Sequence, residues 1–207
     1  FKYGNNDINT FLNFVDNQIN INGLVNTMRD GNFYNGKAVF VSPKGMVVGS
    51  SGVLNVGSLS VYTPTQATYA QYRSNPTADY SGLANSNNGQ PITINGKVLA
   101  ANDVELKGGK VTIAQNAGIV AGVNESALNN LSKAQAQNLF DTLVNTNNIR
   151  YFSNNGNITI ETRQTDTAAG VDIQGTMRNL GNGDINIRNN GSEGVKIAGN
   201  VINANGN

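Results

Sequence analysis

The chain has 207 residues and a mass of 21.8 kDa, so it is long enough to bury one sizeable core. Charged residues make up 13%, about half the share in a typical soluble domain. The net charge of +1 comes without a basic cluster, which excludes an electrostatic surface for nucleic acid or an anionic membrane. Cys and His are both absent, so disulfides, thiolate nucleophiles and the commonest catalytic base and metal ligand are excluded. We expect no cofactor and no metal.

Gly and Asn are both abundant, with 24 Gly and still more Asn. These two residues tolerate left-handed backbone and make tight turns. An Asn-rich disordered tract is the alternative, but Ile and Val recur regularly between the Asn residues. The composition therefore predicts an all-β chain of short strands joined by compact corners, organised as one domain over 1–207.

Residues 1–35 mix Asn with scattered apolar positions, which predicts a cap over the open end of a solenoid. Ile19 and Ile21 alternate as in a strand. A short turn or helix is predicted before them, because four apolar residues have helical spacing: Ile8, Phe11, Leu12 and Val15.

Residues 36–61 contain three short apolar runs, and compact turn signals separate them. The turns are Ser42–Gly45 and Gly49–Gly52. Regular punctuation of this kind predicts the first coils of a β-solenoid. The expected strands are Ala38–Val41, Met46–Val48 and Val53–Val56.

Residues 62–90 carry Tyr, Pro, Thr and Ser without a sustained period, so we expect an excursion from the coils. Tyr69, Tyr72 and Tyr80 are candidates for an adhesive surface, since a tyrosine ring offers contact area and a polar handle. The alternative, which we prefer, is that they pack the excursion onto the flank of the coils.

Residues 91–122 return to short strands, with apolar residues two apart and turn residues between the pairs. A narrow β-solenoid interior is filled in this way. The pairs are Ile92 and Ile94, Val98 and Ala100, Val104 and Leu106, Val111 and Ile113, and Ile119 and Ala121.

Within 123–150, Ser132 and Gln135 have capping-box spacing, and apolar residues follow at helical intervals up to Leu143. They predict one amphipathic helix over about 133–145 that packs on a flank of the coils. Binding to a partner is the less favoured use of its apolar stripe.

Residues 151–207 hold an internal repeat of roughly 24 to 27 residues, in which GVDIQGTM from Gly170 is echoed by GVKIAGNV from Gly194. One coil per repeat places Ile173 over Ile197, Gly175 over Gly199 and Met177 over Val201. Asp172 and Lys196 then point outward. The pattern is uncapped at its end and the chain begins with Phe1, so we expect a processed piece of a longer protein.

A β-helical enzyme that acts on polysaccharides needs clustered carboxylates. The spacing of the acidic residues does not stack two of them one coil apart, so we expect no enzyme. The candidates considered are Asp166, Asp172, Asp184 and Glu193, with Arg163, Arg178 and Arg188.

The stretch from Gly36 to Leu59, GKAVFVSPKGMVVGSSGVLNVGSL, resembles the Asn-Pro-Asn-Gly-Ile motif region of the filamentous haemagglutinin N-terminal domain family. These are the secretion (TPS) domains of two-partner secretion exoproteins, including leukotoxin-like filamentous adhesins. Gly96–Gly122 is similar to the coils that follow in that family. Ser42 and Lys44 replace the two Asn of the usual motif, and an upstream Asn-Pro-Asn-Leu counterpart is missing.

The resemblance implies a right-handed parallel β-helix with an N-terminal cap and extra-coil elements. It also implies recognition in the periplasm by the POTRA domains of an outer-membrane transporter of the TpsB type. The implied recognition or structural motif comprises Ser42, Pro43, Lys44 and Gly45, followed by Asn55 and Gly57.

Our leading hypothesis is therefore a monomeric secretion and folding-nucleation domain that a diderm bacterium exports through the periplasm to its surface. A module that binds host glycan or protein is the runner-up. A carbohydrate-active enzyme is the third and weakest hypothesis.

Overall fold

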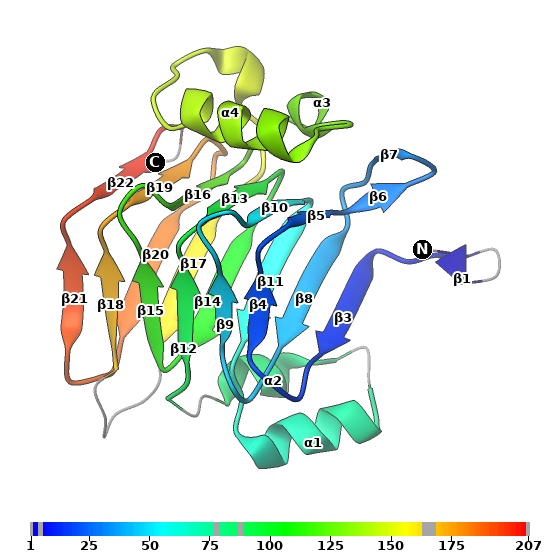
Figure 1. Cartoon of the computed structure of the whole chain (residues 1–207), viewed down its shortest axis with the longest axis vertical. Helices are drawn as coiled ribbons and strands as arrows, with labels where there is room; N and C mark the ends of the chain where they lie inside the picture. Colours follow the sequence, from blue (N-terminus) through cyan, green and yellow to red (C-terminus); the bar gives the residue numbers. More distant parts are fainter. Residues whose placement is uncertain (1, 4–5, 77–78, 87–88, 163–168, 206–207) are drawn as a thin grey trace.

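The computed structural model describes residues 2–3, 6–76, 79–86, 89–162 and 169–205, and the side chains from Ile8 onward. The chain is mostly β, and it builds three parallel sheets of six strands each, stacked in register (Figure 1). We name each sheet after its first strand.

The β3 sheet contains β3 (Thr10–Phe14), β8 (Lys37–Val41), β11 (Ser58–Tyr62), β14 (Val104–Gly108), β17 (Ile158–Thr162) and β20 (Ile185–Asn189). The β4 sheet contains β4 (Ile19–Ile21), β9 (Met46–Val48), β12 (Pro91–Ile94), β15 (Lys110–Ile113), β18 (Gly170–Ile173) and β21 (Gly194–Ile197). The β5 sheet contains β5 (Leu24–Asn26), β10 (Val53–Val56), β13 (Lys97–Ala100), β16 (Gly118–Ala121), β19 (Thr176–Asn179) and β22 (Asn200–Asn203).

The chain visits the three sheets in rotation, one strand from each, and every such round is called a coil below. Strands of successive coils pair in parallel, an architecture consistent with a parallel β-helix. The predicted strands of 36–61 and 91–122 are confirmed. So is the register of the last repeat, in which Asp172 pairs with Lys196, Ile173 with Ile197 and Met177 with Val201.

One apolar core runs through the coils, because alternate residues of each short strand point inward. Leu54, Val98, Ile119 and Met177 form one inward column, and all four are fully buried. Stacking of like side chains one coil apart fills the interior without a large gap between neighbouring coils.

In the described part of the chain, insertions interrupt the succession of coils at three places. The hairpin of β6 (Met28–Arg29) and β7 (Asn32–Phe33) follows the first coil, and β1 (Lys2–Tyr3) and β2 (Asn6–Asp7) form another hairpin before it. Helices α1 (Gln66–Ser74) and α2 (Ser81–Asn85) interrupt the third coil. Helices α3 (Glu125–Leu128), α4 (Lys133–Leu143) and the 3-10 helix η1 (Ile149–Tyr151) separate β16 from β17.

The helix predicted within 123–150 is confirmed as α4, in the third of these regions. Ser132 caps it by accepting from the backbone N–H of Gln135, and the Gln135 side chain accepts from the backbone N–H of Ser132. Ala136, Phe140 and Leu143 bury its apolar stripe against the outer face of the β5 sheet.

Two expectations about helices were wrong. The helical spacing of residues 8–15 belongs to strand β3, in which Phe11 pairs with Ala38 on the inner side and Leu12 pairs with Val39 on the outer side. A strand with apolar residues on both faces imitates a helical period. One helix was predicted, whereas four α-helices occur in the described part of the chain.

The helices cover two of the three outer faces. α1 and α2 pack on the β3 sheet, and α3 and α4 pack on the β5 sheet. The β4 sheet faces the viewer, and none of the described helices lies over it (Figure 1).

Candidate functional site

The turn between β8 and β9 contains the four residues Ser42 to Gly45. Ser42 is buried; its hydroxyl donates to the carbonyl of Asn17 at 2.8 Å and accepts from the backbone N–H of Lys44 at 3.0 Å. Pro43 and Gly45 are also buried, and Lys44 alone is exposed. The turn is therefore an internal corner of the second coil, tied to the first coil through Ser42.

Gly45 is the position of this turn that requires glycine. Its φ of +87° lies in the left-handed region, and an added Cβ would lie 2.4 Å from the carbonyl oxygen of Pro91 in the next coil. Both the backbone conformation and the closeness of the third coil exclude a side chain there.

Asn55 and Gly57, the second part of the predicted motif, lie at the end of β10 and just after it. Both are buried. The Asn55 amide donates to the carbonyl of Leu128 at 2.9 Å and to the side-chain oxygen of Asn26 at 3.0 Å. A Cβ at Gly57 would lie 2.5 Å from the carbonyl oxygen of Gly36. This corner is closed by the preceding coil and by α3.

Of the six predicted motif residues, only Lys44 presents its side chain to solvent in the folded protein. The contact between Asn55 and Leu128 joins residues 73 positions apart. Any partner that reads the other five residues must therefore meet them before the coils and α3 close over them.

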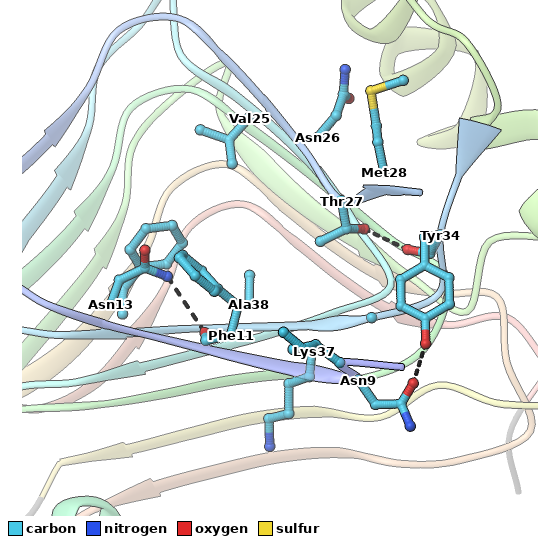
Figure 2. Close-up of a pocket in the computed structure, with 13 residues that line it drawn as sticks. Asn9, Phe11, Asn13, Val25, Asn26, Thr27, Met28, Tyr34, Lys37 and Ala38 are labelled. Atoms are coloured by element: carbon cyan, nitrogen blue, oxygen red, sulfur yellow. Dashed lines mark hydrogen bonds between the residues drawn. The ribbon is translucent and has the colours of Figure 1, made fainter. Parts of the chain in front are cut away.

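The open end of the first coil holds a cavity of about 630 Å³ (Figure 2). The inner side chains of β3, β5 and β8 form its floor, and Met28 and Tyr34 from the region of the first insertion stand at its side. The floor residues are Phe11, Asn13, Val25, Ala38 and Phe40. The cavity is the solvent-facing end of the apolar core.

Comparison of the chain with protein-family models, with curated proteins and with solved structures finds no match in any of the three. Within the described ranges, no helix has the length and apolar character that a membrane crossing needs.

The tyrosines of 62–90 lie in a cluster between the excursion and the coils. The preferred prediction, that they pack the excursion onto the coils, is confirmed for Tyr69. Tyr69 is fully buried; its ring meets Phe14 edge-on at 5.8 Å, and its hydroxyl donates to Asp16 at 2.7 Å. Burial, reinforced by the Asp16 carboxylate, raises the pKa of Tyr69 to about 12. Tyr72 and Tyr80 are half-buried in the same cluster. Tyr69 therefore offers no exposed ring to a partner, whereas Tyr72 and Tyr80 are partly exposed.

A polar cluster on the outer face of the β3 sheet escaped the sequence interpretation. Lys107 lies 2.8 Å from Glu105 of the same strand and 3.7 Å from Glu161 of the next coil. The Tyr62 hydroxyl donates to Glu105. Burial raises the pKa of Glu105, but hydrogen bonds from Lys107 and Tyr62 outweigh burial and hold that pKa below its ordinary value.

This cluster places two carboxylates against the one ammonium group of Lys107, on an outer face that α1 and α2 partly cover, and the positive charge of Lys37 also acts on Glu105. Sequence spacing gave no sign of it, because the insertion of α3 and α4 separates Glu161 from its neighbours in the previous coil. The signal that could have found it is the alignment of Val104–Leu106 with Ile158–Ile160, which puts Lys107 beside Glu161.

Among the described candidates for catalysis, Asp172 and Glu193 line one small pocket together with Lys110 and Lys196. The described basic candidates, Arg178 and Arg188, do not line that pocket. Asp172 is beside Lys196, and Glu193 pairs with Lys110 at 2.7 Å. Arg178 is buried, and its guanidinium donates to the Val144 carbonyl at 2.8 Å, just past the end of α4. Asp166 and Arg163 lie outside the described residues. Asp184 lies just before β20, the last strand of the β3 sheet, and Arg188 lies within that strand.

Proposed function

We propose that this chain is the secretion and folding-nucleation domain of an exported bacterial adhesin of the two-partner class. Its proposed partner is the POTRA region of a dedicated outer-membrane transporter, and its proposed destination is the cell surface or the medium, reached through the periplasm. The observation that carries the proposal is that the motif-bearing stretch, Gly36–Leu59, is one complete coil and its junction to the next.

The finer architecture belongs to the same proposal. We infer a right-handed parallel β-helix, because crossover connections between parallel strands are right-handed in nearly all proteins. Such a fold suits export in the unfolded state, since each coil forms mainly from contacts with the coil before it. Residues delivered first then provide the surface on which later residues fold.

The second coil is well placed to nucleate this process. Val48, Leu54 and Val56 are fully buried, and the coil pairs on both sides, with β3, β4 and β5 before it and with β11, β12 and β13 after it. The motif therefore combines two roles in this proposal. The transporter binds it before the coils close over it, when the turn at Gly45 can already form locally, and the turn becomes a closed corner once the coil has formed.

The test is transporter-dependent secretion of a reporter fused after residue 207. We expect export when the transporter is supplied and none when residues 1–60 are deleted. A matched control is Ile173→Ala, which weakens the core of the fifth coil and leaves residues 1–60 intact; it should still reach the medium. Unchanged export after the deletion would refute the proposal.

A further inference from the structure

The insertion between β16 and β17 lies along the outer face of the β5 sheet (Figure 1). We call its residues 123–152 the strap. Its two ends are held together, because Val123 and Phe152 form an antiparallel bridge and the backbone N–H of Asn124 donates to the Tyr151 carbonyl at 2.8 Å. The strap is therefore one closed loop of chain on the flank of the coils.

The strap supplies the apolar cover of this face. Buried side chains of its helices form one cluster with outward-pointing residues of the sheet. The strap residues are Leu128, Ala136, Phe140 and Leu143, and the sheet residues are Val53, Leu99 and Val120. These three sheet residues belong to the second, third and fourth coils. Without the strap, an apolar surface that crosses three successive coils would face solvent.

The strap also closes over Asn55, which belongs to the second part of the predicted motif. Leu54 and Val56 on either side of it point into the core, so Asn55 points outward. Its Nδ2 donates to the Leu128 carbonyl at 2.9 Å, and the residue is 1% exposed. A buried amide without such an acceptor destabilises the protein. Before the strap docks, water or a bound partner must therefore accept this hydrogen bond.

Hydrogen bonds tie the start of the strap to the beginning of the chain. Three of them span 90 to 111 positions in the sequence. Glu125 and Asn129 are exposed, so their bonds can be removed without loss of core packing. The bonds join the Phe33 N–H to Asn129 at 2.7 Å, the Asn35 amide to Glu125, and Lys133 Nζ to the Asn22 carbonyl at 3.3 Å.

The far end of the strap is held by a later coil. Arg178 of β19 is 4% exposed, and its guanidinium donates to the carbonyls of Val144 at 2.8 Å and Thr146 at 2.5 Å. These carbonyls follow α4, where the helix dipole favours a cation. Strands β5, β10, β13 and β16 precede the strap in the sequence, whereas Arg178 follows it. The face is thus built from residues earlier in the chain than the strap that covers it.

We propose that the outer face of the β5 sheet in the second to fourth coils is the surface that the transporter holds, and that docking of the strap displaces the transporter. This inference rests on the proposed function and names the partner surface beside the same motif. The strap indicates the chemistry that the surface binds. It is an amphipathic segment that lays apolar side chains on the sheet and presents a backbone carbonyl to Asn55. Because strap and transporter need the same residues, only one of them is bound at a time.

The test measures binding of the full chain to the isolated POTRA region of its transporter. Phe140→Ala removes the largest apolar anchor of α4, and a triple variant, Glu125→Ala with Asn129→Ala and Lys133→Ala, removes the bonds to the beginning of the chain. We expect both to bind at least tenfold more tightly than the wild type, since the apparent affinity rises with the fraction of chains whose strap is undocked. Leu83→Ala, which truncates a similarly buried side chain in the other helical insertion, should bind like the wild type.

A further variant locates the surface. Asn55→Ala in the Phe140→Ala background should weaken the binding about fivefold, because the partner's carbonyl then lacks its donor. Amide hydrogen exchange accompanies each measurement. We expect the coils to keep their protection in every variant, and residues 133–143 to exchange faster in the strap variants only.

Binding that both strap variants leave at the wild-type level would overturn this inference and leave the proposed function in place. So would an equal gain in Leu83→Ala and Phe140→Ala, or an Asn55→Ala change without effect. Absence of binding in the wild type and in every variant would overturn both the inference and the proposed function.

Discussion

Two copies of the same repeat, Gly170–Met177 and Gly194–Val201, have nearly the same sequence but different environments. Ile173 is fully buried in the fifth coil, whereas Ile197 of the sixth is 53% exposed. The strand register is the same in both. In this fold, an inward-pointing side chain is fully buried only when a coil packs on each side of its own. The sequence pattern determines only which side chains point inward.

The largest expected difference in unfolding free energy is between truncation of the inner side chain at Ile173 and truncation at Ile197. Ile173→Ala should lower the free energy of unfolding by about 2–5 kcal/mol, because it leaves a cavity between two coils. Ile197→Ala should cost less than about 1 kcal/mol, since its side chain is half in solvent already. Urea unfolding at neutral pH measures both values, and equal losses would contradict this account of the two coils.

A second pair compares glycines with left-handed backbone in an inner and in an end coil. Gly45 and Gly194 have φ of +87° and +73°, but a Cβ at Gly45 would meet the Pro91 carbonyl at 2.4 Å, while a Cβ at Gly194 would meet open space.

Alanine at either position lowers the free energy of unfolding by roughly 1–2 kcal/mol, because it must adopt the unfavourable φ. Gly45→Ala must also push two coils apart, so its loss of unfolding free energy should be the larger of the two. Lys44→Ala, at the exposed position of the same turn, should change that free energy by no more than about 0.5 kcal/mol. Thermal unfolding of the three variants ranks them, and a Gly194→Ala loss as large as that of Gly45→Ala would argue against the clash.

A third comparison sets a fully buried tyrosine of the excursion, Tyr69, against a half-buried one, Tyr80. Tyr69→Phe removes the hydroxyl that ties α1 to Asp16 of the first coil, at a cost of about 1 kcal/mol. Tyr80→Phe, in the same cluster but half-buried, should cost less. Limited proteolysis should cut within 66–85 faster in Tyr69→Phe than in Tyr80→Phe, and the reverse order would count against the role of that hydroxyl.

The smallest effect is a dependence on pH. The Tyr69 hydroxyl and Arg73 hold the pKa of Asp16 below its ordinary value of 3.8, and Lys107 and Tyr62 hold that of Glu105 below 4.5. A lowered pKa in the folded state means that the unfolded state binds more protons. The stabilisation is therefore present above these ordinary values and is lost as the pH falls through the lower folded values.

Urea unfolding between pH 7 and pH 3 should show stability falling on the acid side. Asp16→Asn should flatten the fall without reversing it, because Glu105 remains. Stability that rises on acidification over this range would contradict the assigned pKa directions.

The regular coils were predictable because their signal is local. Two apolar residues two apart, followed by Gly or Asn, specify a short strand and a corner, and the repeat from Gly170 also gave the register. The capping box at Ser132 predicted α4 for the same reason.

What escaped prediction depends on contacts across long separations. The Asp16–Tyr69 bond joins residues 53 positions apart, and Asn55 reaches Leu128. Tyr69 was therefore interpretable as exposed or as packed, and Glu105, Lys107 and Glu161 were not recognised as neighbours. Strand β3 was predicted as a turn or helix because it has apolar residues on both faces. Its outer face is apolar because it packs against α1 and α2.

The proposal that Gly36–Leu59 directs export through the shape of its turn is tested most directly by secretion of single variants in the presence of the transporter. Gly45→Ala should reduce export strongly, whereas Lys44→Ala and Gly194→Ala should be exported at the wild-type level. Ile173→Ala separates stability from recognition, because it weakens the fold without altering the turn and should still be exported. Loss of export in Lys44→Ala with normal export of Gly45→Ala would contradict the account.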